Sequence, residues 1–125
     1  MKVGFIGLGN VGGKLAGSLL RNNFDLTVRD LDENLTKSFK DLGAKVANSA
    51  KELAEKVDLI ITCLPTPRIC AEVMEADDGV INGLSENKIW LEMSTTDEAE
   101  IKRISKKIIS KKGNSIRWAC KWRMS

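Results

Sequence analysis

Histidine and tyrosine are absent from this sequence of 125 residues, and aromatic side chains make up only 5% of it. Without imidazole side chains, the sequence argues against a zinc site and against any catalysis that depends on histidine. The cysteines, Cys63, Cys70 and Cys120, are an odd and widely spaced set without a CxxC pair. We therefore expect no metal site, and we interpret Cys63, at the end of an apolar run, as a small buried hydrophobic residue.

Long apolar runs are missing too. No run approaches the ~20 residues that a membrane-spanning helix needs. Lys2 is followed by strand-like residues and a glycine turn, which is not the pattern of a secretory signal. The length allows one domain at most, and the hydrophobic fraction of 42% can supply a real core. We expect a cytoplasmic protein without a membrane partner.

Acidic residues are absent after Glu100, where the chain becomes strongly basic. Nine of the 20 Lys and Arg residues lie from Lys102 onward, which leaves 11 against 17 acidic residues in the first 101 positions. That part carries a net charge of −6, whereas the whole chain carries +3. A solvated, Lys-rich helix face explains the basic stretch more simply than a nucleic-acid site, so we expect no nucleic-acid partner.

The first thirty residues hold the pattern around which the chain is organised. Lys2–Ile6 is a largely apolar run of strand length, Gly7–Gly12 is rich in glycine, and an apolar-periodic helix follows. A second short run, Leu26–Asp30, ends on an acid. This order is typical of a dinucleotide site, because the glycines allow a tight turn, the approach of a pyrophosphate and close helix packing. The N-terminus of the helix offers N–H groups to phosphates.

The rest of the chain alternates strand-like and helix-like segments. Such alternation indicates parallel strands joined by right-handed helical crossovers. We predict an α/β fold of the Rossmann type, with a doubly wound, mainly parallel sheet that is incomplete at the C-terminus. Its ligand site should lie at the carboxyl ends of the strands. The predicted strands cover residues 2–6, 26–30, 45–47, 57–64 and 88–93, and the predicted helices begin after residue 12 and near residues 33, 50, 68 and 96.

Three motifs in the same order resemble a known family. They are Val3–Gly12, the strand end Ile60–Pro65 and the segment Glu92–Asp97, and the likeness covers about residues 1–115. The chain resembles the 3-hydroxyisobutyrate dehydrogenase group of the β-hydroxyacid dehydrogenases, which is related to 6-phosphogluconate dehydrogenase. The resemblance implies an NAD(P)-binding domain followed by an all-helical second domain. It also implies a homo-oligomeric oxidoreductase that oxidises a small 3-hydroxy acid by hydride transfer to NAD or NADP.

The resemblance assigns cofactor contacts to the glycine turn and to the second strand. Asp30 takes the place of the family's ribose-reading residue, where a carboxylate accepts hydrogen bonds from ribose hydroxyls and repels a 2′-phosphate, so we favour NAD. Arg29 keeps NADP open, since an arginine at a strand end can reach a phosphate. An ordinary turn or helix-capping acid is the alternative reading of Asp30. The pyrophosphate would be held by Gly7, Leu8, Gly9, Asn10, Val11 and Gly12.

Two further strand ends carry residues that the resemblance assigns to the site. Leu64 and Pro65 would border the adenine and nicotinamide side, although Pro65 is equally well explained as the end of a strand. Ser94 resembles the family serine that contacts the substrate carboxylate, and Thr95 resembles a residue near the nicotinamide. Helix capping is the alternative for both hydroxyls, and the two roles are compatible.

The last ten residues depart from the family pattern. Residues 116–125 show no helix or strand period and hold two of the three tryptophans, where the family has Asp-x-Pro-Val-Ser-Gly-Gly. A one-base shift of the reading frame can turn them into Leu-Asp-Gly-Pro-Val-Ser-Gly-Gly-Cys, so we hypothesise a frameshifted tail behind a cofactor domain of residues 1–115.

The departure also bears on catalysis. The family's catalytic lysine belongs to the helical second domain, which is absent here, and no lysine of residues 1–115 matches its motif. We therefore expect cofactor binding without turnover, since oxidation of an alcohol needs a group that takes its proton. An NAD(H)-sensing or partner-binding module without catalysis is the alternative reading, because the fold alone does not fix a function.

Overall fold

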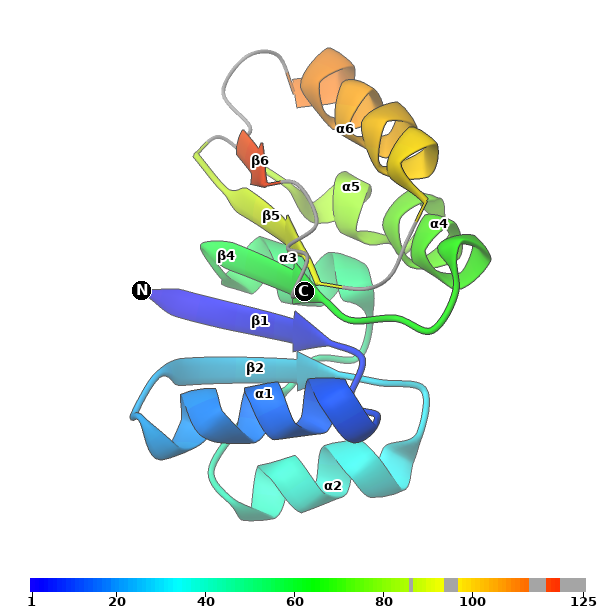
Figure 1. Ribbon diagram of the computed structural model, residues 1–125. Coiled ribbons are helices and arrows are strands. Elements are labelled where there is room, and N and C mark those ends of the chain that lie inside the picture. The colour runs from blue at the N-terminus through cyan, green and yellow to red at the C-terminus, as the bar shows by residue number, and fades with distance from the viewer. Residues whose placement is uncertain (86, 94–96, 113–116, 120–125) are drawn as a thin grey trace.

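The computed structural model is a six-stranded sheet with helices on both faces (Figure 1). The structure describes residues 1–85, 87–93, 97–112 and 117–119. The strand order is β3-β2-β1-β4-β5-β6, and all neighbouring strands run parallel. The strands are β1 (Lys2–Ile6), β2 (Asp25–Arg29), β3 (Lys45–Val46), β4 (Leu59–Thr62), β5 (Ile89–Glu92) and β6 (Arg117–Ala119), and the helices are α1 (Asn10–Arg21), α2 (Glu33–Asp41), α3 (Ala50–Lys56), α4 (Pro67–Glu75), α5 (Val80–Gly83) and α6 (Glu98–Lys112).

The predicted Rossmann-type architecture is confirmed, with one strand more than the five predicted. β6 lies in the tail for which the sequence showed neither a helix nor a strand period, and it pairs in parallel with β5. β6 was not predicted, because a strand at a sheet edge draws its hydrogen bonds from the neighbouring backbone and needs no side-chain period.

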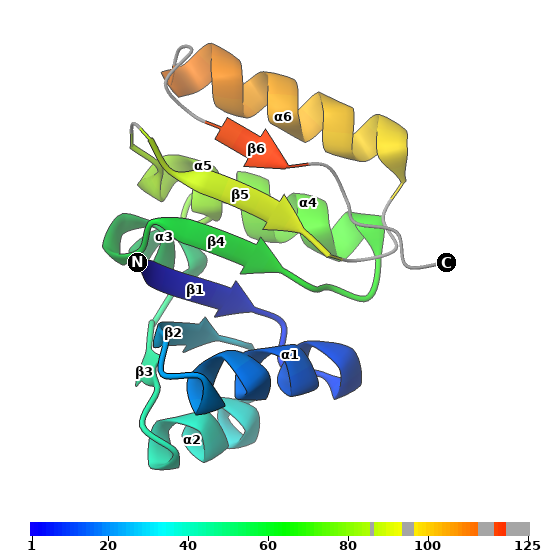
Figure 2. The ribbon, with the colours of Figure 1, turned by 60° about the vertical axis from the view of Figure 1, so that its left-hand side comes forward.

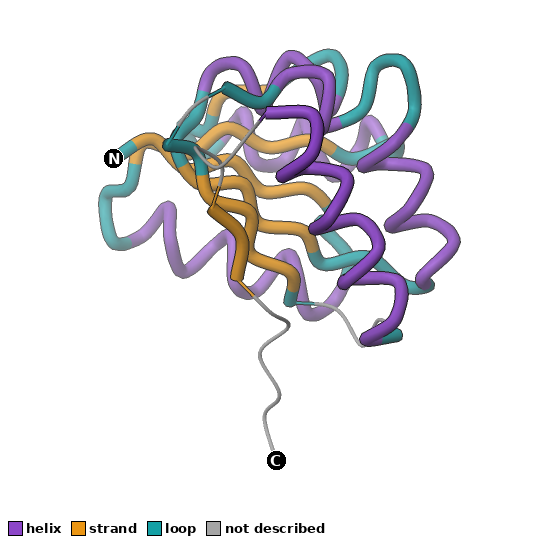
Figure 3. The backbone as a smooth tube through the Cα atoms, turned by 90° about the horizontal axis from the view of Figure 1, so that it is seen from above, coloured by secondary structure: helices purple, strands orange, loops and turns teal. Residues whose placement is uncertain are grey.

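The helices divide between the two faces of the sheet. α1 and α2 pack on one face, over β1 and β2, and α3 to α6 pack on the other face (Figures 2 and 3). A right-handed crossover places its helix on the opposite face when the chain reverses its direction along the sheet. The reversal falls between β3, at one edge, and β4, beside β1, so the chain changes faces at α3.

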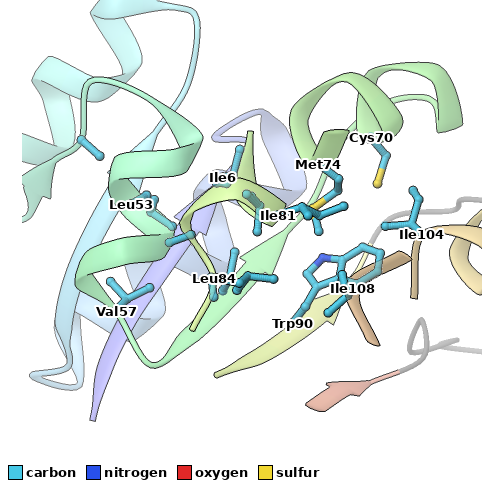
Figure 4. Close-up of a cluster of buried hydrophobic side chains, with 14 of the residues drawn as sticks. Ile6, Leu53, Val57, Cys70, Met74, Ile81, Leu84, Trp90, Ile104 and Ile108 are labelled. Atoms are coloured by element: carbon cyan, nitrogen blue, oxygen red, sulfur yellow. The ribbon is translucent and has the colours of Figure 1, made fainter. Parts of the chain in front are cut away.

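The larger hydrophobic core lies between the sheet and helices α3 to α6 (Figure 4). Successive strand residues point to opposite faces, so Ile60 and Trp90 enter this core, while Ile61 enters the cluster under α1 and α2. α6 closes the core with isoleucines at helical spacing, and its Lys102, Lys106 and Lys107 are exposed. The buried isoleucines of α6, each at most 3% exposed, are Ile101, Ile104 and Ile108.

Capping residues set the helix boundaries and therefore the places where strands resume. The Asp32 side chain accepts the N–H two residues on at 2.9 Å, and the Ser49 hydroxyl accepts the N–H three residues on at 3.0 Å. Asn23, with φ 66°, follows α1, and Gly43, with φ 107°, follows α2. Asp32 and Ser49 thus mark the starts of α2 and α3, and Asn23 and Gly43 lie just beyond the ends of α1 and α2.

Candidate functional site

A cavity of about 1000 Å³ lies at the carboxyl ends of the central strands. It is bordered by the turn between β1 and α1, the residues after β2 and the loop from β4 into α4. A doubly wound sheet binds its ligand at this edge, where the strand order reverses. The predicted site residues that line the cavity are Gly7, Gly9, Asn10, Val11, Gly12, Arg29, Asp30, Leu64 and Pro65.

The turn between β1 and α1 requires glycine at two positions. Gly7 has φ +102°, and a Cβ there would lie 2.2 Å from the backbone oxygen of Cys63. A Cβ on Gly12 would lie 1.9 Å from the backbone oxygen of Gly7, so α1 packs this closely only because that side chain is missing. The predicted tight turn and close helix packing are thereby confirmed. A Cβ on Gly9 would meet no described atom within 4 Å, so this position faces open space.

The first turn of α1 offers backbone N–H groups to the cavity. Its N-cap, Gly9, has no side chain that could accept a hydrogen bond. Within the described part of the chain, the N–H groups of Asn10, Val11 and Gly12 have no acceptor. Unpaired N–H groups and the positive end of a helix dipole attract anions. The turn therefore fits a phosphate group, and the open space at Gly9 leaves room for one.

Asp30 lies one residue beyond β2 and is held by two backbone N–H groups. The N–H of Leu8 donates to Asp30 Oδ2 at 2.7 Å, and the N–H of Asp32 donates to Oδ1 at 2.8 Å. The turn role that was the alternative reading of Asp30 is thus present in the structure. It does not exclude a ribose contact, because each carboxylate oxygen keeps a further lone pair. Leu8 is the predicted turn residue outside the cavity lining, since its side chain is 2% exposed and its N–H binds Asp30.

Carboxylates outnumber cationic groups among the described residues that line the cavity. Arg29 and Asp30 both border it although they are consecutive, because Asp30 lies beyond the end of β2, where the strand alternation stops. The acids are Asp30, Asp32, Glu72 and Asp78. An additional phosphate outside the helix N-terminus would therefore meet mainly negative charge.

The loop from β4 into α4 supplies another wall. Leu64 and Pro65 line it as part of the loop, because β4 already ends at Thr62. Cys63, which we predicted to be buried, is instead half-buried and borders the cavity. The apolar run continues past the last strand residue, so burial does not follow from its length. Partial burial, together with the charge of Glu92, holds the pKa of the Cys63 thiol above its ordinary value.

The substrate-side hydroxyls lie outside the described residues. Ser94 and Thr95 belong to the segment 94–96, so their assigned contacts remain predictions. Met93, directly before them, lines the cavity. The chain therefore enters this segment from the cavity wall.

A buried polar network beside the β4–α4 loop was not predicted from the sequence. Glu92 is 0% exposed, and its Oε2 accepts hydrogen bonds from the Thr62 hydroxyl at 2.7 Å and the Cys70 thiol at 3.0 Å. The indole N–H of Trp90 donates to the same hydroxyl at 2.9 Å. Burial and the Glu92 charge raise the pKa of the Cys70 thiol. The only sequence signal was an acid at the end of an apolar strand, where burial and exposure look alike.

Residues 2–118 match the family described as the NAD binding domain of 6-phosphogluconate dehydrogenase. The matched region contains the glycine turn, Asp30 and the cavity wall after β4, and it extends three residues beyond the predicted domain boundary at residue 115. The chain belongs to this family. It is an NAD-binding domain of the β-hydroxyacid dehydrogenase type, as the resemblance implied. The glycine turn and the N–H groups of α1 described above fit such a cofactor.

Named relatives and solved structures agree with this assignment. The mitochondrial 3-hydroxyisobutyrate dehydrogenase of Mus musculus is 36% identical over 106 residues, which cover 85% of this chain and 32% of that protein. A 3-hydroxyisobutyrate dehydrogenase structure from Salmonella typhimurium matches with a TM-score of 0.83 at 24% identity, covering 94% of this chain and 40% of that one. An imine reductase from Myxococcus stipitatus in complex with NADP+ has a TM-score of 0.80 at 17% identity, covering 94% and 39%. A variant of that reductase was solved with NAD+.

The two kinds of likeness support different statements. At these identities, the structural matches establish the fold alone. The sequence matches establish the family, yet this chain spans about a third of the length of the mouse protein. Neither likeness therefore establishes the activity or the substrate of a whole enzyme for this chain.

Proposed function

We propose that the cavity binds NAD, with the pyrophosphate at the first turn of α1 and the adenosine ribose on Asp30. The observation that carries this is the set of unpaired N–H groups of Asn10, Val11 and Gly12, directly beside the open space at Gly9. The Asp30 carboxylate stands at the same cavity with lone pairs left for ribose hydroxyls. Leu64 and Pro65 then supply an apolar wall along the rest of the cofactor.

The proposal favours NAD over NADP because of the charge around Asp30. A 2′-phosphate would stand beside the carboxylates of Asp30 and Asp32. Arg29 is the feature that favours NADP, since it borders the same cavity. We weigh the two carboxylates above the one guanidinium, because Asp30 is fixed by two hydrogen bonds at the place where the ribose would lie.

We further propose that the domain serves an oxidoreductase acting on a 3-hydroxy acid of the 3-hydroxyisobutyrate kind. When bound, the nicotinamide accepts the hydride that leaves the alcohol carbon. Ser94 is the candidate contact for the substrate carboxylate, and Thr95 the candidate neighbour of the nicotinamide. No lysine of residues 1–115 matches the family's catalytic motif, so this chain should bind the cofactor without oxidising the alcohol.

The domain organisation remains a hypothesis as well. Residues 1–115 form the cofactor domain in this reading, and residues 116–125 are a frameshifted tail. The parallel pairing of β6 does not conflict with a frameshift, because backbone pairing is indifferent to side chains. The nucleotide sequence decides the matter: codons 117–125 must yield Asp-x-Pro-Val-Ser-Gly-Gly in the next frame, or the hypothesis fails.

The cellular location and the oligomeric state are proposals as well. None of the helices in the described ranges has the length and apolar character of a membrane span. Residence in the cytoplasm is our proposal, whereas the mouse relative is named as mitochondrial, and cell fractionation with an antibody would separate the two. Homo-oligomer formation is proposed only for a complete, two-domain enzyme.

Titration calorimetry with NAD, NADH, NADP and NADPH tests the proposal on the purified chain. We expect NAD and NADH to bind, and NADP at least about tenfold more weakly, a difference of about 1.4 kcal/mol. Gly9→Val places a side chain in the open space and should abolish binding. Gly17→Ala lies outside the cavity lining and serves as the matched control. Binding of none of the four nucleotides would favour a partner-binding module instead.

A second assay addresses catalysis. With NAD and 3-hydroxyisobutyrate present, we expect no rise in NADH absorbance from this chain, under conditions in which a two-domain relative gives a clear rise. Turnover by this chain alone would show that residues 1–125 contain a proton acceptor that the family comparison does not reveal.

A further inference from the structure

The glycine turn is hydrogen-bonded to the end of β2 by the Asp30 side chain as well as by the backbone bonds of the sheet. The last backbone bond between the two segments runs from the N–H of Gly7 to the carbonyl oxygen of Arg29, at 3.1 Å. One residue further on, the N–H of Leu8 donates to Asp30 Oδ2 at 2.7 Å. The carboxylate thus extends the ladder beyond the point where the two backbones separate.

This side-chain bond depends on the unusual backbone of the turn. In a regular strand, successive N–H groups point to opposite neighbours, so Leu8 would turn its N–H toward β4 rather than toward β2. Gly7, with φ +102°, takes the chain out of the extended conformation. The N–H of Leu8 consequently points to the β2 side, where it would lack an acceptor if Asp30 were a small apolar residue.

We propose that Asp30 is a positioning residue for the glycine turn, and that it holds the turn in the shape that presents the N–H groups of Asn10, Val11 and Gly12 to a diphosphate. The inference rests on the proposed NAD site and adds a second role for the acid that would read the ribose. The second bond of the carboxylate, from the N–H of Asp32 at 2.8 Å, fixes its orientation. Asp30 therefore stays in place before any ligand arrives, and it pairs the Leu8 N–H group, which follows the last ladder bond at Gly7.

The two roles make different predictions for ligands without a ribose. If Asp30 only reads the ribose, its removal should not weaken the binding of inorganic pyrophosphate. The loss of a negative charge should even make pyrophosphate bind more tightly. If Asp30 also shapes the turn, pyrophosphate should bind more weakly to a variant without the Asp30 carboxylate than to wild type, although a repelling charge has been removed. Asp32 provides the matched control, because its carboxylate borders the same cavity and, among the described residues, accepts only from the start of α2, at Asn34.

Amide hydrogen exchange of the ligand-free chain, read residue by residue by NMR, is the decisive experiment. In Asp30→Ala we expect the Leu8 amide to exchange at least tenfold faster, while the amides of β1 and the Leu8 amide in Asp32→Ala keep their wild-type rates. Asp30→Asn keeps one carbonyl acceptor, so its Leu8 exchange rate should lie between those of wild type and Asp30→Ala. This variant also covers the case in which Asp30→Ala does not fold. An unchanged Leu8 rate in both Asp30 variants would overturn the inference.

Pyrophosphate titrations supply the second readout. We expect the dissociation constant to rise at least threefold in Asp30→Ala and not to rise in Asp32→Ala. Tighter pyrophosphate binding in both variants would mean that Asp30 acts through its charge alone, and would also overturn the inference. If wild-type chain binds no NAD, the proposed function fails, and the Leu8 exchange rates still decide whether Asp30 holds the turn.

Discussion

The two sides of the cavity are held in place by different kinds of interaction. On the side of β1, α1 and β2, position depends on the backbone: two glycines without room for a Cβ, a helix N-terminus and one carboxylate that binds two N–H groups. On the side of β4, β5 and α4, position depends on buried side chains that converge on Glu92. The first side presents unpaired N–H groups to the cavity, whereas the network on the second side is buried beside the β4–α4 loop.

The difference has a physical reason. A surface that binds phosphates must leave N–H groups unpaired, so it cannot use those groups for its own stability and relies on close backbone packing instead. A wall that only needs to stay in place can satisfy all of its polar groups internally. Substitutions on the two sides should therefore fail in different ways, by steric clash on the first and by unpaired polar groups on the second.

The largest loss should come from Gly12→Ala. The added Cβ would stand 1.9 Å from the backbone oxygen of Gly7 and 3.3 Å from the ring of Phe5, and a backbone atom cannot move aside as a flexible side chain can. We expect a loss of about 4 kcal/mol in the free energy of unfolding, or no folded protein. Urea denaturation followed by circular dichroism measures it.

Gly9→Ala is the matched control on the same turn. Its Cβ meets no described atom within 4 Å, so the free energy of unfolding should change by no more than about 0.5 kcal/mol. NAD affinity should still fall, because the methyl group enters the space assigned to the pyrophosphate. Equal destabilisation by both alanines would break the distinction between a packing glycine and a ligand-facing glycine.

On the other side, Glu92→Ala should cost about 3 kcal/mol. The substitution removes the acceptor of the Thr62 hydroxyl and the Cys70 thiol in a region that is 0% exposed, and it leaves a cavity. Thermal and urea unfolding measure the loss. Glu92→Gln, which retains one carbonyl acceptor and nearly the same volume, should recover more than half of it. A neutral Glu92→Ala would show that the network does not hold the strand ends together.

These two sides also differ in how far the sequence reveals them. The glycine turn, the place of Asp30 at the cavity and the helix after the turn could be predicted, because they depend on local backbone chemistry at fixed spacing, although α1 begins at Asn10 and not after Gly12. The Glu92 network could not, because it joins residues 22 and 30 positions apart, from three elements, and an acid after an apolar strand is usually solvated. β6 was missed for a related reason, since its pairing depends on a neighbouring strand and not on its own residues.

Exposed ion pairs on the same side should matter less than the buried network. Glu75, at the end of α4, accepts hydrogen bonds from Arg103 at 2.9 Å and from Lys107 at 2.7 Å, which joins α4 to α6. Arg103 contributes most to lowering the pKa of Glu75 to about 2. The Arg103 and Lys107 side chains are 47% and 53% exposed, so solvent screening limits the expected loss in Glu75→Gln to about 1 kcal/mol.

The pH dependence of this contribution has a definite sign. A carboxylate whose pKa is lower in the folded state stabilises it above the unfolded value of 4.5, and the stabilisation is lost as the pH falls from there to about 2. Wild type and Glu75→Gln should thus differ most above pH 4.5 and converge in acid. Glu72→Gln is the control, since the Arg68 and Glu72 side chains of that pair are 88% and 63% exposed and its removal should cost no more than about 0.3 kcal/mol.

One expected effect has the opposite sign, and it returns to the glycine side. Gly17 lies inside α1, and an added Cβ would meet only the terminal nitrogen of Arg21, at 3.2 Å, which can swing away. Alanine restricts the unfolded chain and favours the helix, so Gly17→Ala should stabilise the protein by about 0.5–1 kcal/mol without changing NAD affinity. Urea titration measures the free energy of unfolding of Gly17→Ala and Gly12→Ala side by side. The comparison is stringent, because both changes add one methyl group to the same helix. Destabilisation by Gly17→Ala would mean that the packing requirement of α1 extends beyond the turn that faces the ligand.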